Sequence, residues 1–154
     1  MPRQRVPCPG IDPCKKLREW GKPGTGPGEF DTLHGIGISP EGNIYIADRD
    51  NHRIQWFDSQ GKFLGQFKYP GEVYTLTINR AGDLYAVTHV PGAPLDLEKM
   101  PDGHGPFTIH KIDRGSSKML AKIEIRTHQV GTAPDGTILP GTRSPSLVLF
   151  KPHK

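Results

Sequence analysis

Long apolar runs, clustered cysteines and blocks of like charge are all missing from this sequence of 154 residues. No apolar stretch approaches the roughly 20 residues of a membrane-spanning helix. The opening segment, MPRQRVPCPGIDPC, carries charge but has no hydrophobic region of the kind found in signal peptides. These absences argue against a membrane protein and favour a cytoplasmic one. A chain of this length is normally one domain.

The only cysteines, Cys8 and Cys14, lie in a proline-rich segment that we expect to be an irregular leader over residues 1–14. Their spacing leaves a small disulfide loop and a metal site open as alternatives to two reduced thiols, which we favour. The net charge of +4 comes from 20 dispersed Lys and Arg residues against 16 Asp and Glu. So mild a bias is typical of a solvated surface, and a nucleic-acid partner is not expected.

Glycine (19) and proline (16) are abundant, whereas the apolar spacing of long helices is absent. Apolar and polar residues instead alternate over short stretches, as they do in half-buried strands. The chain is therefore predicted to be all-β, with tight turns between antiparallel strands. In the best-defined region the strands are expected at 35–39, 43–48, 52–58 and 62–68.

An internal repeat organises these strands, with a glycine at the same position of each copy (Gly42, Gly82 and Gly136). The first copy covers residues 34–68. The second covers 74–125 and carries an insertion at 89–105, and insertions in repeats often lie on the binding face. The third copy, 128–152, lacks a fourth strand, which residues 15–21 are predicted to supply.

The segment GTGPGEF, followed by HGIGISPEGNIYIADRDNHRIQWFDSQGKFLGQF, resembles an NHL repeat, a unit that forms one blade of a β-propeller. The resemblance is close over residues 21–68, weaker over 69–125 and partial over 126–152. It implies a β-propeller of four-stranded antiparallel blades over residues 15–152. The first strand of each blade would line a central channel.

About three blades per chain is fewer than the 4–8 of closed propellers. Three arrangements satisfy this count: two chains that build a six-bladed ring, a piece of a longer protein, or an open small propeller. We favour a homodimer in which each chain lends its N-terminal strand, because an unpaired blade edge favours aggregation.

His34, Tyr74 and His128 occupy the same position in the three copies, at the start of the first strand. We expect these side chains to converge at the mouth of the channel and to be the catalytic residues. Neutral imidazole nitrogens are suitable Zn²⁺ ligands. A histidine that merely caps a strand is the alternative interpretation.

Among NHL-type propellers, the pattern of His before a small residue and an apolar pair is similar to that of the peptidyl-amidoglycolate lyases. In those enzymes such histidines, from different blades, are zinc ligands. His34 (HGI) and His128 (HQV) match the pattern, and Tyr74 stands where a third histidine would be. His89 and Asp50 fall near the places of an Arg and a Tyr that the lyases use.

The architecture also resembles that of propeller lactonases, which hold Ca²⁺ through carboxylates and amides. Ca²⁺ takes six to eight oxygen ligands. The candidate oxygen ligands, all expected near strand ends, are Asp31, Glu72, Asp48 and Asp50. Of these, Asp31 and Glu72 are predicted to bind the metal beside His34 and His128.

The function inferred from these features is a metal-dependent hydrolase that opens a lactone or ester, with Ca²⁺ or Zn²⁺ as its cofactor. The metal would bind the carbonyl oxygen, and a histidine or carboxylate would act as general base. N-acyl-homoserine lactones are a candidate substrate, which would make the activity quorum-quenching. The residues predicted to bind this substrate are His89, Leu95, Leu97 and Met100.

Two alternatives stay open. One is a non-catalytic NHL propeller that binds protein or RNA, and the other is a lyase of the amidoglycolate type. The remaining polar residues of the repeat signature, Asp48, Asn51, His52 and Arg53, are predicted to be structural and to tie neighbouring strands together.

Overall fold

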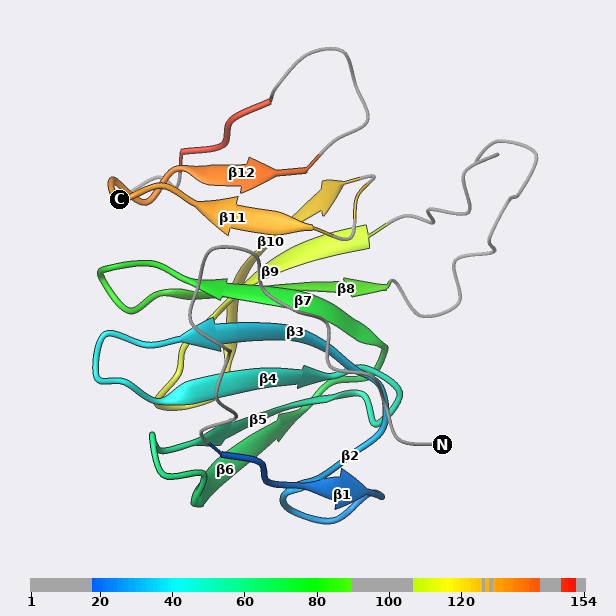
Figure 1. Ribbon diagram of the computed structural model, residues 1–154. Coiled ribbons are helices and arrows are strands. Elements are labelled where there is room, and N and C mark those ends of the chain that lie inside the picture. Colours follow the sequence, from blue (N-terminus) through cyan, green and yellow to red (C-terminus); the bar gives the residue numbers. More distant parts are fainter. Residues whose placement is uncertain (1–17, 90–106, 126, 128, 142–147, 152–154) are drawn as a thin grey trace, which may run out of the picture.

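The computed structural model describes residues 18–89, 107–125, 127, 129–141 and 148–151 (Figure 1). The predictions for the leader with its two cysteines, for insertion residues 90–105 and for His128 concern residues outside this set. No helix occurs in the described part of the chain, so none there is long and apolar enough to cross a membrane. The predicted all-β class is confirmed.

The first unit is a four-stranded antiparallel sheet whose strands pair in chain order. It consists of β3 (Leu33–Ile38), β4 (Ile44–Asp48), β5 (Arg53–Phe57) and β6 (Phe63–Lys68). Each strand lies within about two residues of its predicted position. Two short strands, β1 (Lys22–Pro23) and β2 (Glu29–Phe30), pair in parallel ahead of this sheet.

The second unit repeats the same plan, with a sheet of strands in chain order. Its strands are β7 (Val73–Ile78), β8 (Leu84–His89), β9 (Phe107–Ile112) and β10 (Met119–Ile125). The third unit is a hairpin of β11 (Val130–Thr132) and β12 (Ile138–Pro140), extended by an isolated bridge between Ile138 and Phe150.

The three hairpin turns between first and second strands are built alike. Gly42, Gly82 and Gly136 have φ of +88°, +86° and +84°, a left-handed conformation that glycine adopts without a Cβ clash. The amide of each glycine donates to the carbonyl oxygen three residues earlier, at 2.8 Å to Ser39 and 3.0 Å in the other two turns. The repeated glycine therefore sets the turn geometry of all three units.

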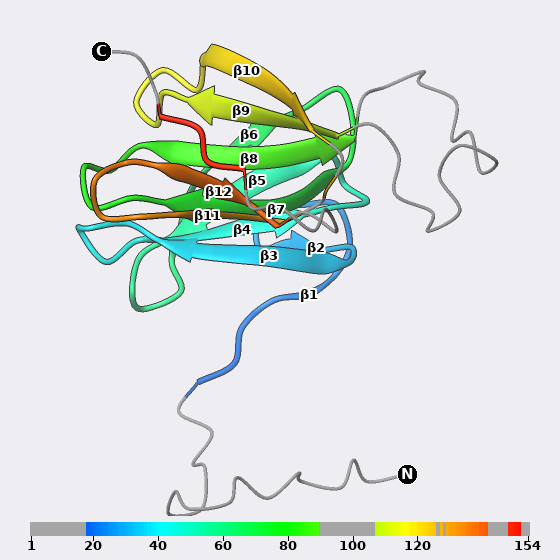
Figure 2. The same ribbon diagram turned by 90° about the horizontal axis from the view of Figure 1, so that it is seen from above.

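The sheets lie side by side like the blades of an incomplete propeller. β3 lies next to β7, and β7 next to β11, so the first strands of the three units are neighbours (Figures 1 and 2). Gly35 of β3 allows this close approach, because a Cβ there would lie 2.7 Å from Cα of Thr75. The chain is thus a partial β-propeller.

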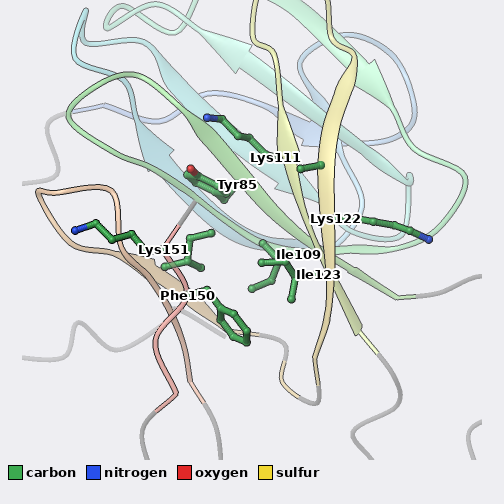
Figure 3. A pocket seen from close by; sticks show the side chains of 9 residues that line it. Tyr85, Ile109, Lys111, Lys122, Ile123, Phe150 and Lys151 are labelled. Atoms are coloured by element: carbon green, nitrogen blue, oxygen red, sulfur yellow. The ribbon is translucent and has the colours of Figure 1, made fainter. Parts of the chain in front are cut away.

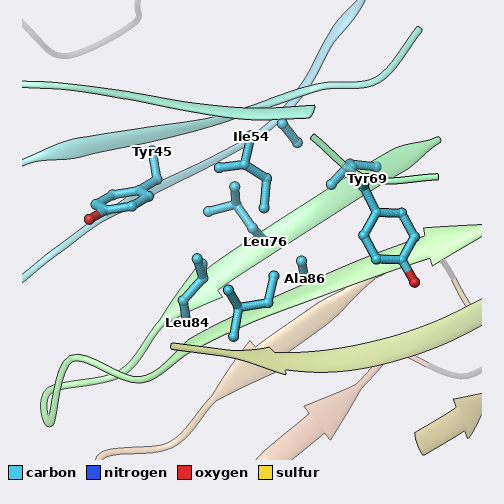
Figure 4. Close-up of a cluster of buried hydrophobic side chains, with 9 residues drawn as sticks. Tyr45, Ile54, Tyr69, Leu76, Leu84 and Ala86 are labelled. Carbon is cyan, nitrogen blue, oxygen red and sulfur yellow. The ribbon is translucent and has the colours of Figure 1, made fainter. Parts of the chain in front are cut away.

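The first two blades enclose the main hydrophobic core between their faces (Figure 4). Buried residues from both sheets meet there, and Leu76 of β7 lies among side chains of the first sheet. The cluster contains Tyr45, Ala47, Ile54, Tyr69, Val73, Leu76, Leu84, Ala86 and Ile112. A second cluster, around Tyr85, Ile109 and Ile138, joins the second blade to the third hairpin.

The described part of the predicted closing segment lies on the first blade. Arg18 donates from Nη1 to the carbonyl oxygen of Ser59 at 3.2 Å, and the Trp20 ring lies 6.2 Å from that of Phe57. Figure 1 shows β1 and the third hairpin at opposite ends of the stack. Within a single chain, residues 18–21 therefore do not close the third unit. Residues 15–17 lie outside the described set.

Candidate functional site

The repeat signature forms a buried hydrogen-bond network that holds the first blade together. Asp48 is fully buried, and its Oδ2 accepts bonds from Arg53 Nε at 2.7 Å and Gln55 Nε2 at 3.1 Å. Arg53 also donates to carbonyl oxygens of the segment before β3, including that of Glu29 in β2 at 2.9 Å. Asn51 joins the same network through Asp48 and the Gly24 carbonyl. The predicted structural role of this signature is confirmed for Asp48, Asn51 and Arg53.

His34 and Tyr74 are both β-bulge residues. The pairing of β3 with β4 shifts register between Leu33 and Gly35, and that of β7 with β8 shifts between Val73 and Thr75. A bulge leaves its extra residue out of the ladder and re-aims the side chain. A β-bulge therefore redirects the side chains of His34 and Tyr74 at equivalent places in two blades.

The two bulges bring their side chains into contact. The rings of His34 and Tyr74 meet edge to face with centroids 5.2 Å apart. Two of the three equivalent repeat positions are therefore in contact. His128, the third member, lies outside the described residues.

The Tyr74 phenol lies among polar and aromatic groups from both blades. Its hydroxyl donates to Glu72 Oε2 at 2.9 Å, and its ring meets that of Phe107 at 5.0 Å. The Arg49 guanidinium lies 5.5 Å from the ring centroid. Burial, followed by the bond to Glu72, raises the pKa of Tyr74. The phenol therefore stays protonated at neutral pH and acts as a hydrogen-bond donor.

Arg49 stands at the end of β4 beside this phenol. Its Nε lies 2.8 Å from Oδ1 of Asp50, and Thr32 donates a hydroxyl bond to the same carboxylate. The hydrogen bond to Asp50 raises the pKa of Arg49, and the same bond lowers the pKa of Asp50. A fixed positive charge from the first blade thus lies against a tyrosine of the second.

His89 ends β8 at the position that Arg49 occupies in the first unit. The Arg49 amide donates to Thr32 O, and the His89 amide donates to Glu72 O, both at 3.1 Å. The Nε2 atom of His89 is buried without a hydrogen-bond partner, which is uncommon for a buried polar atom. We name the five residues the inner-strand cluster: His34, Arg49, Glu72, Tyr74 and His89.

The other predicted site residues have separate positions. Asp31 is exposed, and its amide donates to Asp48 Oδ1 at 2.7 Å, so its backbone belongs to the structural network. Leu95, Leu97 and Met100 lie outside the described residues. Among the residues that are described, no three His, Cys, Asp or Glu side chains are grouped to hold a metal ion. The donors described here do not by themselves fit a Zn²⁺ or Ca²⁺ site.

Arg49 was not predicted as a site residue, although the sequence holds a signal for it. In an antiparallel pair, the residue after the second strand lies beside the start of the first. Arg49 and His89 therefore belong beside His34 and Tyr74. The aromatic partner Phe107 follows the insertion, and its place in the cluster depends on tertiary packing.

Comparison with known proteins identifies an NHL repeat at residues 30–57. Peptidyl-glycine alpha-amidating monooxygenase B of Xenopus laevis is 34% identical over 149 residues, which cover 90% of this chain and 17% of that protein. The A form is 28% identical, and the match covers 90% of this chain and 16% of that protein. The chain thus spans only a small part of these relatives.

Protein brain tumor of Drosophila melanogaster is 30% identical over 83 residues, 47% of this chain and 8% of that protein. Among solved structures, a chain in the crystal structure of the mitotic checkpoint complex superposes with a TM-score of 0.53 at 13% identity. This match covers 95% of the present chain and 44% of the other. At such low identity it supports the shared fold and nothing more.

Proposed function

We propose that this chain is the catalytic part of a propeller enzyme of the amidoglycolate-lyase type. Such an enzyme cleaves a peptide that ends in α-hydroxyglycine into a peptide amide and glyoxylate. The observation that carries the proposal is the match to the two amidating monooxygenases, which extends over 90% of this chain. Their names describe the amidation of peptidyl-glycine. The match to protein brain tumor, by comparison, covers only 47% of this chain.

The reaction has three requirements. The hydroxyl group on the α-carbon loses its proton, the C–N bond breaks with its electron pair moving to nitrogen, and that nitrogen gains a proton. The hydroxyl oxygen becomes the carbonyl oxygen of glyoxylate. A site for this reaction needs a proton acceptor, a proton donor and a cation for the substrate carboxylate.

The inner-strand cluster contains a group for each requirement. Tyr74 stays protonated and is the donor to the departing nitrogen, while Glu72, 2.9 Å from the phenol, accepts the hydroxyl proton and returns it to Tyr74. Arg49 supplies the cation: its Nε and Nη2 already bond the two oxygens of Asp50, and the remaining guanidinium donors would bind the substrate carboxylate. The exposed His34 meets the Tyr74 ring edge to face.

A divalent metal remains part of the proposal. Because the described residues alone do not assemble a metal site, this part depends on His128 joining His34. Zn²⁺ or Ca²⁺, when bound, would polarise a substrate oxygen. The proton transfers assigned to Tyr74 and Glu72 do not require it. Metal analysis of the purified chain and of His34→Ala tests this part separately.

Hydrolysis of a lactone or ester is the competing reaction, with water as nucleophile and Glu72 as its base. N-acyl-homoserine lactone is the substrate with which this hydrolase activity would be tested against the lyase activity. Its predicted acyl-binding residues lie outside the described part of the chain, so no described contact favours an acyl chain. A protein- or RNA-binding role without catalysis is the remaining alternative.

The deciding experiment incubates the chain, with and without added Zn²⁺ or Ca²⁺, with an α-hydroxyglycine-extended peptide in ¹⁸O-labelled water. The expected products are glyoxylate and a peptide amide, and the peptide amide should contain no ¹⁸O. Both should form faster than in the blank without protein. A parallel incubation uses N-acyl-homoserine lactone. Incorporation of one ¹⁸O into its acid product, with no peptide amide from the first substrate, would support the hydrolase instead. If neither substrate is turned over, the result would favour the protein- or RNA-binding role.

A further inference from the structure

A cavity of about 400 Å³ opens between the second blade and the third hairpin (Figure 3). It lies among strands β8, β9, β10 and β12 and is separate from the inner-strand cluster. Its lining consists of Tyr85, Ile109, Lys111, Ala121, Lys122, Ile123, Ile138, Phe150 and Lys151. The volume falls within the range of small-molecule sites, which combine apolar walls with a few polar groups.

The walls of the cavity are mainly aliphatic and aromatic. Ile109 and Ile138 are almost fully buried, and Ile123 and Phe150 are partly exposed. Figure 3 shows Ile109, Ile123 and Phe150 close together at one end. Apolar surface of this kind gains free energy when a ligand removes it from water.

The other end of the cavity is polar. In Figure 3 the hydroxyl of Tyr85 and the ammonium groups of Lys111 and Lys151 lie on the same side, whereas Lys122 points the opposite way. The cavity therefore has a phenol and two lysine ammonium groups, each beside an aspartate, at one end and hydrocarbon at the other.

Tyr85 supplies the observation that points to a ligand. Its side chain is 1% exposed, and its buried hydroxyl meets no hydrogen-bond acceptor, since the polar group beside it is the Lys111 ammonium, which is a donor. An unpaired buried donor costs free energy that a ligand acceptor would restore. Burial raises the pKa of Tyr85, and the nearby charge of Lys111 offsets part of that rise. The phenol is thus protonated and needs an acceptor.

The two lysines can each serve a second acceptor. Lys111 lies 2.9 Å from Oδ1 of Asp83, and the exposed Lys151 lies 3.6 Å from Oδ2 of Asp135. An ammonium has three donors, and one ion pair does not use them all. A carboxylate between Tyr85 and these lysines would therefore accept bonds that water or the aspartates do not fully supply.

We propose that this cavity binds a medium-chain aliphatic carboxylate. The carboxylate accepts from the Tyr85 hydroxyl and lies between Lys111 and Lys151, and the hydrocarbon chain packs on Ile109, Ile123 and Phe150. The site is independent of the function proposed for the inner-strand cluster.

Isothermal titration of the purified chain with sodium decanoate, below its micelle concentration, tests the site. Decanoate is expected to bind with 1:1 stoichiometry, and decanol, which has the same chain without the charge, at least about tenfold more weakly. Tyr85→Phe should weaken decanoate binding by about tenfold, because a hydrogen bond to a charged group is lost. Ile123→Trp fills the cavity and should abolish binding.

Lys151→Gln and Lys62→Gln form a matched pair, since Lys62 is an exposed lysine of the first blade outside the cavity. The first should weaken binding and the second should not. Thermal unfolding of each variant separates lost binding from lost structure. The proposal is overturned if decanoate does not bind, if decanol binds equally well, or if folded Tyr85→Phe and Ile123→Trp bind as the unaltered chain does.

Discussion

The Arg53 guanidinium donates from Nε to Oδ2 of Asp48 at 2.7 Å, and both side chains are at most 2% exposed. This buried pair connects β4 to β5 and, through further Arg53 bonds, to the segment before β3. The signature residues of the repeat thus stabilise the blade, while the residues at its bulge face solvent and the next blade.

Arg53→Met should destabilise the chain by about 3–5 kcal/mol, because it leaves the carboxylate of Asp48 buried without its charged partner. Urea unfolding at neutral pH measures the change in the free energy of unfolding. Lys22→Met is the matched control. It removes the exposed partner of Glu29 and should cost no more than about 1 kcal/mol. Equal costs for the two variants would contradict the assigned role.

Gly35→Ala should destabilise the contact between the first two blades more than Gly37→Ala does. A Cβ at Gly35 would meet the backbone Cα of Thr75 at 2.7 Å, and the sheets must separate to admit it. A Cβ at Gly37 would first meet Cδ1 of Leu76 at 2.6 Å, the movable end of a side chain. Overpacking costs roughly 1–3 kcal/mol, and we expect Gly35→Ala to lie at the upper end. A larger effect at Gly37 in thermal unfolding would refute this explanation.

Tyr74→Phe should lower kcat/KM for the α-hydroxyglycine peptide by about 10²–10⁴-fold, the range typical of a lost proton donor. Glu72→Gln should have a similar effect, because the substrate hydroxyl then lacks its proton acceptor and Tyr74 is not reprotonated. Tyr45→Phe is the control, since Tyr45 belongs to the core between the blades. Unchanged kcat/KM in a folded Tyr74→Phe variant would remove the phenol from the mechanism.

His110 should make the protein less stable in mild acid. Its Nε2 accepts a hydrogen bond from the Tyr69 hydroxyl, and burial, together with the charge of Lys122, lowers its pKa below the ordinary value of 6.5. As the pH falls below about 6.5, the unfolded chain binds a proton before the folded chain does, so the free energy of unfolding decreases until the folded pKa is passed.

Denaturant unfolding between pH 7.5 and pH 5, within roughly the range over which histidines titrate, measures this loss. His110→Gln should flatten the dependence on pH. Tyr69→Phe keeps the histidine and should retain the dependence. An unchanged slope in His110→Gln would assign the acid sensitivity to other groups.

A six-bladed ring of two chains predicts a particle of twice the 17.0 kDa of one chain. Leu33, Ile36 and Ile38 of β3 are 58%, 65% and 64% exposed, so the first blade presents an apolar face that a second copy could cover. Light scattering of the purified chain measures the mass, and Ile36→Glu should shift it to that of a monomer. A folded, active monomer of the unaltered chain would exclude the two-chain ring.

The strands were predictable from sequence because their causes are local. Alternation of side chains decides which stretches form strands, and a glycine with positive φ closes each hairpin. Gly42, Gly82 and Gly136 therefore revealed the units. The parallel pairing of β1 and β2, and the contact of Trp20 with the first blade, depend on distant packing and were not predicted.

The site was predictable only in part. Repeat position correctly paired His34 with Tyr74. It did not reveal the bulges that turn these side chains, because a bulge adds one residue to a strand without a distinctive sequence. It also missed Arg49, whose place beside Tyr74 depends on how two blades pack. The predicted roles of His34, Tyr74 and the remaining site residues stay predictions.

The hairpin turns at Gly42, Gly82 and Gly136 also bear on how the chain folds. Each is closed by a hydrogen bond between residues three apart, and none needs another part of the chain to form. Contacts so close in sequence form in microseconds, well before pairings across a long insertion. Folding can therefore begin in any of the three hairpins, and the pairing of β8 with β9 across the insertion is expected to come later.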